Sequence, residues 1–241
     1  VNSWFKNAQH FGFTGTPIFK ENIGADGRTT DDIYDTRLHT YLIKDAVRDH
    51  NVLPFNVTYI NTIHSKEDIE NLNGEVEALN IKEVYENEKR LNQIAQHIIL
   101  NHSSKTYNRQ YNAIFAVSDT RTALKYYDIF KEINNDLKVT TIFTWAANEE
   151  DNDEHQKDDT LTSRHGLEKV IDDYNDKYHQ NFSTDTFSDF FNDVSKRMKN
   201  HDAKSPENNI DVLIVVNMFL TGFDAPTLNT LYVDKNLQYH G

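Results

Sequence analysis

The stretch IDVLIVVNMFLTGFDAP, residues 210–226, decides the fold of this chain. Its first seven residues contain no charge after Asp211, so they predict a strand that is buried on both faces. A polar turn follows, in which Thr221 offers a hydroxyl, Gly222 an open backbone and Asp224 a carboxylate. A buried strand that ends in such a turn predicts a ligand site beyond the end of the strand.

Strands and helices alternate along the rest of the chain. Short runs rich in β-branched and aromatic residues predict strands at 55–61, 113–117, 138–145, 210–216 and 229–234. Apolar residues at helical spacing predict helices from Leu38 to before Pro54, within 66–100, at 124–133, at 163–179 and at 186–199. This alternation predicts an α/β fold with a mostly parallel sheet and helices on both faces.

Composition limits the classes of protein. The 241 residues are 37% apolar and 26% charged, which predicts a core diluted by polar insertions. The net charge of −13 argues against autonomous binding of nucleic acid. The absence of cysteine favours the cytoplasm, and no apolar run approaches the roughly 20 residues of a membrane-spanning helix. Seven carboxylates within residues 149–159 predict a mobile loop through self-repulsion.

Three polar turns follow predicted strands, at 14–17, 118–121 and 221–226. In parallel sheets, ligands bind beyond the carboxyl ends of the strands, where helix N-termini converge. Ser118 and Arg121 could hold a phosphate at the start of a helix. They could equally be the helix cap and a first-turn charge, and each turn taken singly could be ordinary turn chemistry.

Several catalytic motifs are absent from the sequence. It contains no GxxxxGK[ST] loop for a nucleotide triphosphate and no DEAD-like motif for magnesium after a strand. The histidines have no HExxH spacing, and without cysteine a zinc site is not expected. The chain is therefore predicted to have no catalytic residues and no metal site of its own, and to be unable to hydrolyse ATP unaided.

Three stretches carry a family resemblance: GFTGTPI (12–18), YLIKDAVRDHNVLPFNVTY (41–59) and IDVLIVVNMFLTGFDAPTLNTLYVDKNLQYHG (210–241). They resemble the motor region of the restriction (R) subunit of type I restriction-modification enzymes, which are superfamily-two translocases. The resemblance runs from the first residues to the last and is weaker in the inserted helices. It implies a RecA-like fold of the P-loop NTPase type, with ATP bound between two lobes.

The resemblance also implies roles for the polar turns. The turn that resembles motif III would couple nucleotide state to DNA grip through Thr14, Gly15 and Thr16. The DNA phosphates would be contacted from two turns, by Ser118, Arg121 and Thr221. The nucleotide would be contacted from the turn that resembles motif V, by Gly222 and Asp224.

The resemblance implies a fragment of a larger subunit. Residues 1–19 would be a remnant of the first lobe, 20–54 a connecting loop and helix, and 55–241 the second lobe, with insertions near 62–110 and 146–205. The Walker motifs, the nuclease domain and motif VI would lie outside this chain. ATP and Mg²⁺ would be cofactors of the parent subunit, with neither assigned to this fragment alone.

The implied partners are double-stranded DNA, the methylation and specificity subunits, and the first RecA-like lobe of the parent chain, with no membrane. One alternative is a lobe of another superfamily-two helicase, such as a repair or remodelling enzyme. Another is a nucleotide-sugar or small-ligand binding module without a motor role. A third is a docking domain whose helices within 66–100 and 163–199 bind protein partners.

Overall fold

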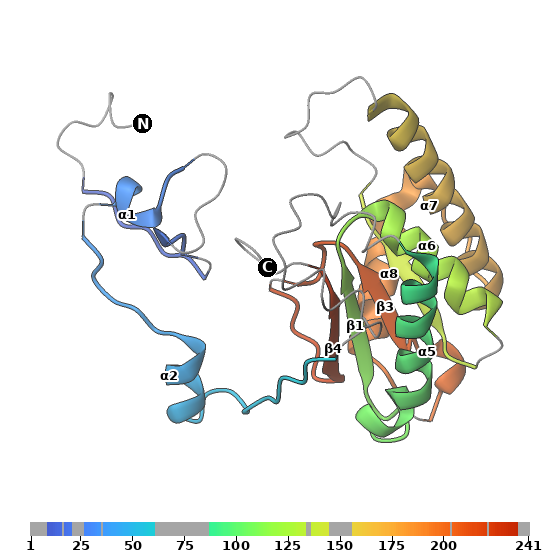
Figure 1. Cartoon of the computed structure of the whole chain (residues 1–241), viewed down its shortest axis with the longest axis horizontal. Coiled ribbons are helices and arrows are strands. Elements are labelled where there is room, and N and C mark those ends of the chain that lie inside the picture. Colours follow the sequence, from blue (N-terminus) through green and yellow to red (C-terminus); the bar gives the residue numbers. More distant parts are fainter. Residues whose placement is uncertain are drawn as a thin grey trace, which may run out of the picture. The chain divides into compact units, whose positions relative to one another are not determined.

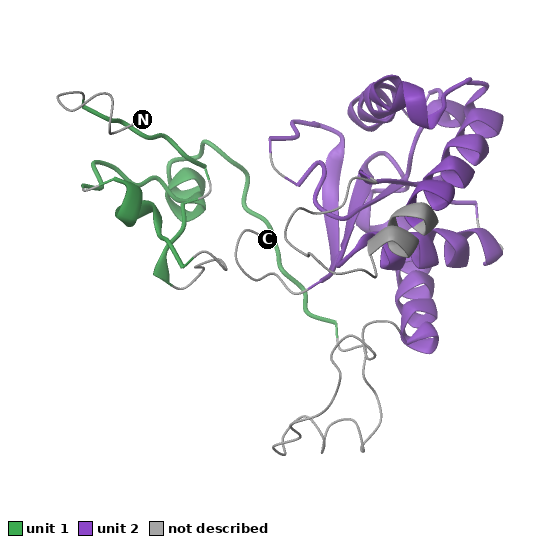
Figure 2. Ribbon diagram, turned by 90° about the horizontal axis from the view of Figure 1, so that it is seen from above, with its two compact units in different colours: residues 1–60, 236–241 green, residues 61–235 purple. Residues whose placement is uncertain are grey.

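The computed structural model describes most of the chain. The described residues are 9–15, 17–20, 27–34, 36–60, 87–133, 136–144, 156–202, 204–220 and 222–235, and of 156–162 only the backbone. Contacts divide the chain into two compact units, one formed by 1–60 with 236–241 and the other by 61–235 (Figure 2). The division concerns compactness alone, so the predicted lobe and insertion boundaries stay predictions.

The first unit has little regular structure. Its helices are α1 (Thr30–Ile33), capped by the Thr29 side chain, and α2 (Ile43–Arg48). The predicted helix from Leu38 to before Pro54 is therefore confirmed only over its middle part, Ile43–Arg48. Thr29 and Ala46 are the buried residues among those described in 9–60.

The strand predicted at 55–61 is wrong over the described residues 55–60, which have no strand and are exposed. Val57 is 63% exposed and Tyr59 is 93% exposed. A β-branched and aromatic composition favours a strand only when a neighbouring strand supplies hydrogen bonds and a surface to pack on. Neither is present for this stretch among the residues that the structure describes.

The second unit contains a four-stranded, fully parallel sheet with the order β2-β3-β1-β4. The strands are β1 (Asn112–Val117), β2 (Val139–Ile142), β3 (Val212–Val215) and β4 (Leu228–Asp234). Every residue of β1 and β3 is buried, because each of these strands has neighbours on both sides and is covered on both faces. The predicted parallel α/β fold is confirmed.

Four helices pack around the sheet (Figure 1). They are α5 (Glu88–Lys105), α6 (Thr120–Glu132), α7 (Gln156–Tyr178) and α8 (Phe187–Lys199). The 3₁₀ turns η2 (Thr184–Thr186) and η3 (Pro206–Asn208) flank α8. The chain passes from β1 through α6 to β2 and returns through α7 and α8 to β3. The α6 helix packs on the face that carries Phe115 of β1, and α7 lies beside α6, since the Tyr127 hydroxyl donates to Asp173 at 2.9 Å.

The core forms where helix stripes meet the sheet. Leu91, Ala95 and Ile98 form the buried stripe of α5, as their spacing predicts. In α6 the ring of Tyr126 packs edge-on against Phe115 of β1, with centroids 4.7 Å apart. The buried residues of α6 include Ala123, Tyr126, Tyr127 and Phe130, whereas Leu124 is only partly buried.

The acidic stretch 149–159 does not form one loop. Residues 156–159 begin helix α7, so the predicted mobile loop is wrong there, and 149–155 lie outside the described residues. Carboxylates near a helix N-terminus interact favourably with the helix dipole, which offsets part of their mutual repulsion.

Candidate functional site

Of the three predicted polar turns, the one at 118–121 begins directly after β1, and the segment that contains 221–226 leaves the end of β3. Because the sheet is fully parallel, all four strands end at the same edge. Ser118 directly follows β1, and Val216 directly follows β3. Lys235 follows β4 at this same edge.

The turn after β1 is organised by a helix cap. Asp119 is the N-cap of α6, and its Oδ1 accepts a hydrogen bond of 2.8 Å from the Thr122 amide. Ser118 donates from Oγ to Asp119 Oδ2 at 2.6 Å, and Ser118 itself is exposed. The cap is therefore Asp119 rather than Ser118. Ser118 and Arg121 both lie exposed at the start of α6.

The turn at 14–17 belongs to the first unit. Thr14 and Gly15 are exposed, and no strand precedes them among the described residues 9–15. Thr16 lies outside the described residues, as does Thr221 of the third turn. The coupling role assigned to Thr14, Gly15 and Thr16 stays a prediction.

Gly222 and Asp224 lie in what we call the return segment, residues 216–227. Since β3 and β4 are parallel, this segment must carry the chain from the carboxyl edge of the sheet back to the amino edge. Gly222 has a φ of +71°, in the left-handed region that favours glycine, and no atom lies within 4 Å of the position of a Cβ. Asp224 is exposed. The backbone at Gly222 is thus open to close approach, with a carboxylate two residues away.

Lys235, which is not among the residues predicted from sequence, holds the start of the return segment. Its Nζ donates to the Val216 carbonyl at 3.2 Å and to Asn217 Oδ1 at 3.0 Å. Partial burial lowers the pKa of this lysine. Because β1 lies between β3 and β4, the Lys235 side chain spans the end of β1. The one available signal was its place as the first charged residue after a strand.

A buried polar junction holds the end of β4. The Asp234 carboxylate accepts from Arg90 Nη1 at 3.1 Å and from the Tyr126 hydroxyl at 2.5 Å, and it also pairs with Arg90 Nη2. Burial and the Asp234 charge raise the pKa of Tyr126, so the phenol stays protonated and donates. The junction joins α5, α6 and β4 beside the carboxyl edge, and sequence spacing offered no sign of it.

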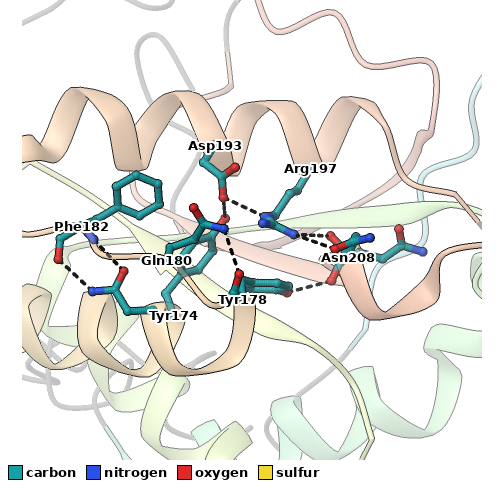
Figure 3. Close-up of polar contacts among 9 residues, drawn as sticks. Tyr174, Tyr178, Gln180, Phe182, Asp193, Arg197 and Asn208 are labelled. Carbon is teal, nitrogen blue, oxygen red and sulfur yellow. Dashed lines mark hydrogen bonds and ion pairs between the residues drawn. The ribbon is translucent and has the colours of Figure 1, made fainter.

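A second polar network joins α7 to α8 (Figure 3). Asp193 Oδ2 accepts from the Tyr174 hydroxyl at 2.7 Å and from Arg197 Nε at 2.7 Å. The Arg197 guanidinium lies 4.2 Å from the ring centroid of Tyr178 and donates to the Asn208 carbonyl at 3.2 Å. This network fixes α8 to α7 and to the turn η3.

No group of three or more histidine, cysteine or carboxylate side chains among the described residues is arranged to hold a metal ion. No helix within these residues is long and apolar enough to cross a membrane.

Two family profiles match this chain. The profile described as "Type I restriction enzyme subunit R domain 3" matches residues 109–241, which cover α6, α7, α8 and the whole sheet. The profile described as "SWI2/SNF2 ATPase" matches residues 1–91. The first match covers more than half of the chain.

Curated relatives agree with these profiles. A type I restriction enzyme endonuclease subunit of Staphylococcus aureus is 51% identical over 244 residues, covering 100% of this chain and 26% of the relative. One of Staphylococcus saprophyticus is 53% identical with the same coverage. A putative subunit of Methanocaldococcus jannaschii is 27% identical, covering 98% of this chain and 23% of the relative. The chain thus spans about a quarter of the length of these relatives.

Proposed function

Because the chain belongs to the R subunit family of type I restriction enzymes, we propose that its residues 55–241 act as the second RecA-like lobe of an ATP-dependent DNA translocase. In the parent subunit, ATP would bind between this lobe and a first lobe, and closure and opening of the pair would alternate the grip on DNA phosphates. Residues 1–19 would contribute the last part of the first lobe.

The observation that carries this proposal is the return segment. It leaves the end of a buried parallel strand, has open backbone at Gly222, and presents the exposed carboxylate of Asp224. A bare backbone with a nearby carboxylate suits a nucleotide, whose phosphates approach the main chain and whose ribose hydroxyls donate to an acid. Gly222 and Asp224 would face ATP, and Thr221 the DNA.

The turn after β1 would contact the DNA backbone. Ser118 and Arg121 are exposed at the N-terminus of α6, where a hydroxyl, a guanidinium and the helix dipole all favour a phosphate. The N-cap role of Asp119 does not exclude this contact, because Ser118 can rotate its hydroxyl from Asp119 to an incoming oxygen. The Asp119 carboxylate opposes an anion, so the Arg121 charge is the larger favourable contribution.

The whole activity belongs to the parent subunit in this proposal. ATP and Mg²⁺ would be its cofactors, and DNA and the methylation and specificity subunits its partners. With no GxxxxGK[ST] loop in the sequence, the 241-residue chain alone should not turn over ATP. The family match over 109–241 favours a restriction motor over other superfamily-two helicases and over a small-ligand module.

The substitution Asp224→Ala in the parent subunit tests the proposal. Loss of a charged hydrogen bond to the nucleotide corresponds to roughly a 10- to 100-fold fall in kcat/KM for ATP during DNA translocation. The matched control is Asp172→Ala, which removes an exposed carboxylate from α7. Equal translocation by wild type and Asp224→Ala, with both correctly folded, would remove the nucleotide contact from this segment.

A further inference from the structure

We infer that helix α8 sets the position of the return segment, and that Phe191 is a positioning residue for Gly222 and Asp224. The inference rests on the proposed function for its catalytic consequence, but its structural part can be tested separately. Neither the family match nor the sequence pattern assigns any role to α8, which the resemblance places within an insertion.

The return segment has no regular structure of its own. Its described residues form bends and turns between β3 and β4, without the hydrogen-bond ladder of a helix or strand. The short contact from the Leu228 amide to the Ala225 carbonyl, at 3.0 Å, closes only its last turn. Its conformation must therefore be fixed by what it packs against.

Three phenylalanine rings supply that packing. The ring of Phe191, on α8, stacks on Phe219 with centroids 4.7 Å apart and planes inclined by 11°. Phe219 in turn meets Phe223 edge-on at 4.6 Å. On the other side of Phe223, the ammonium of Lys199 lies 5.2 Å from the ring centroid. Phe191 lies in the second turn of α8 and Lys199 at its end, so the middle of the return segment runs along most of the length of this helix.

The backbone of the return segment has an unfavourable conformation that the ring packing must stabilise. Phe219 has a φ of +63°, in the left-handed region that phenylalanine rarely adopts. A residue in this conformation persists only where its surroundings determine it. Here the stack on Phe191 holds the ring, and Gly222 takes the second left-handed position three residues later.

The far end of the return segment is also bound to α8. Thr227 Oγ1 donates to the Met198 carbonyl at 2.8 Å, at the last turn of the helix. The same carbonyl accepts from Asn112 Nδ2 at 2.8 Å, at the start of β1. Since the Tyr174, Asp193 and Arg197 network fixes α8 to α7, the helix is a rigid support. A displacement of α8 would carry Gly222 and Asp224 with it.

Backbone ¹⁵N relaxation of the 241-residue chain tests the structural part, because it reports the mobility of a segment that lacks a hydrogen-bond ladder. In Phe191→Leu, which keeps an apolar side chain but removes the ring, the order parameters of the described amides from Phe219 to Ala225 should fall from about 0.85 toward about 0.6. The matched control, Phe182→Leu, removes a partly buried ring that packs on Tyr174 and Phe190 instead. It should leave these amides unchanged.

Equal order parameters in Phe191→Leu and wild type would overturn the inference. So would an equal fall in both variants, since that would report general loosening of the core. If Phe191→Leu does not fold, Phe191→Met provides a longer side chain, and the same comparison with Phe182→Leu applies.

Steady-state kinetics of the parent subunit test the catalytic part. Phe191→Leu should raise the KM for ATP several-fold and change kcat less, because the ligand contacts are displaced rather than removed. Phe182→Leu should leave the KM unchanged. If Asp224→Ala has no effect, the proposed function fails, whatever Phe191→Leu does. If Asp224→Ala impairs the motor and Phe191→Leu does not change the KM, the positioning role of Phe191 fails alone.

Discussion

At the scale of single residues, His102 is a histidine held without contact to water. It lies in the last turn of α5, fully buried, and neither ring nitrogen has a hydrogen-bond partner among the described residues. Burial lowers its pKa from 6.5 to about 4, and the nearby charge of Arg109 adds to the effect while Asp211 opposes it. The fold therefore holds His102 as the neutral imidazole.

The burial of His102 makes stability depend on pH. Because its pKa is lower in the folded state than in the unfolded chain, its contribution is fully present above pH 6.5 and is lost as pH falls toward 4. The loss between pH 7 and pH 5 should be about 2 kcal/mol, the order expected from the two pKa values. Urea unfolding of wild type and His102→Leu at both pH values measures it.

Comparing wild type with His102→Leu isolates the contribution of His102 to the pH dependence of stability. The same carboxylates titrate in wild type and in His102→Leu, so only the difference between their pH profiles belongs to His102. Parallel profiles would mean that His102 is charged, or exposed, in the folded protein.

At the scale of elements, the guanidinium of Arg197 on α8 contacts both α7 and the turn η3. Arg197 bonds Asp193 through Nε, covers the ring of Tyr178, and reaches Asn208 beyond the helix. Lysine carries the same charge on a stem that lacks the planar fork and cannot stack in this way. The substitution Arg197→Lys therefore keeps the charge and removes the geometry.

Arg197→Lys should lower the free energy of unfolding by about 1–3 kcal/mol, as expected for loss of charged hydrogen bonds and ring contact. Denaturant unfolding measures the change. The neighbouring Lys196 is exposed, and Lys196→Ala should change stability by no more than about 0.5 kcal/mol. A similar small change for both substitutions would show that the network adds nothing to stability.

At the scale of the whole molecule, burial is concentrated in the second unit. The core runs through α5, the sheet and the helices up to α8, whereas residues 9–60 contribute only Thr29 and Ala46 among their described members. A chain of residues 61–235 should therefore unfold within about 4 °C of the 241-residue chain, the shift that corresponds to roughly 1 kcal/mol. Differential scanning calorimetry measures both midpoints.

A shorter chain serves as the control for the 61–235 truncation. A chain that begins at residue 106 also lacks α5, and with it the buried side chains of Leu91, Ala95 and Ile98. It should not give a cooperative transition, because the face of the sheet that α5 covers would be open to water. A large loss of stability in the 61–235 chain would contradict the division of the core.

The sequence predicted elements well where a local pattern suffices. The apolar runs at 113–117 and 210–216 became β1 and β3, because strands buried on both faces need no polar side chains. The run at 55–61 is also rich in β-branched and aromatic residues, yet its described residues form no strand. A strand needs a partner, and the presence of a partner cannot be read from the stretch itself.

The residues of the candidate site also fall into those with a local sequence signal and those without one. Ser118, Gly222 and Asp224 could be singled out because turn residues after a strand are a local signal. Lys235 and Phe191 could not, because each acts on a segment that is brought near only by folding. The roles of the turn residues themselves stay predictions.

The sequence by itself determined the alternation of strands and helices, the parallel sheet and the family, because apolar periodicity and motifs are properties of neighbouring residues. Only the tertiary structure decided that α8 supports the return segment, that Lys235 spans the end of β1, and that His102 is sealed from water. Other contacts of the core join residues much farther apart in the chain, for instance Arg90 with Asp234 at a separation of 144. Which distant residues meet is set by packing of the whole core, and no local pattern encodes it.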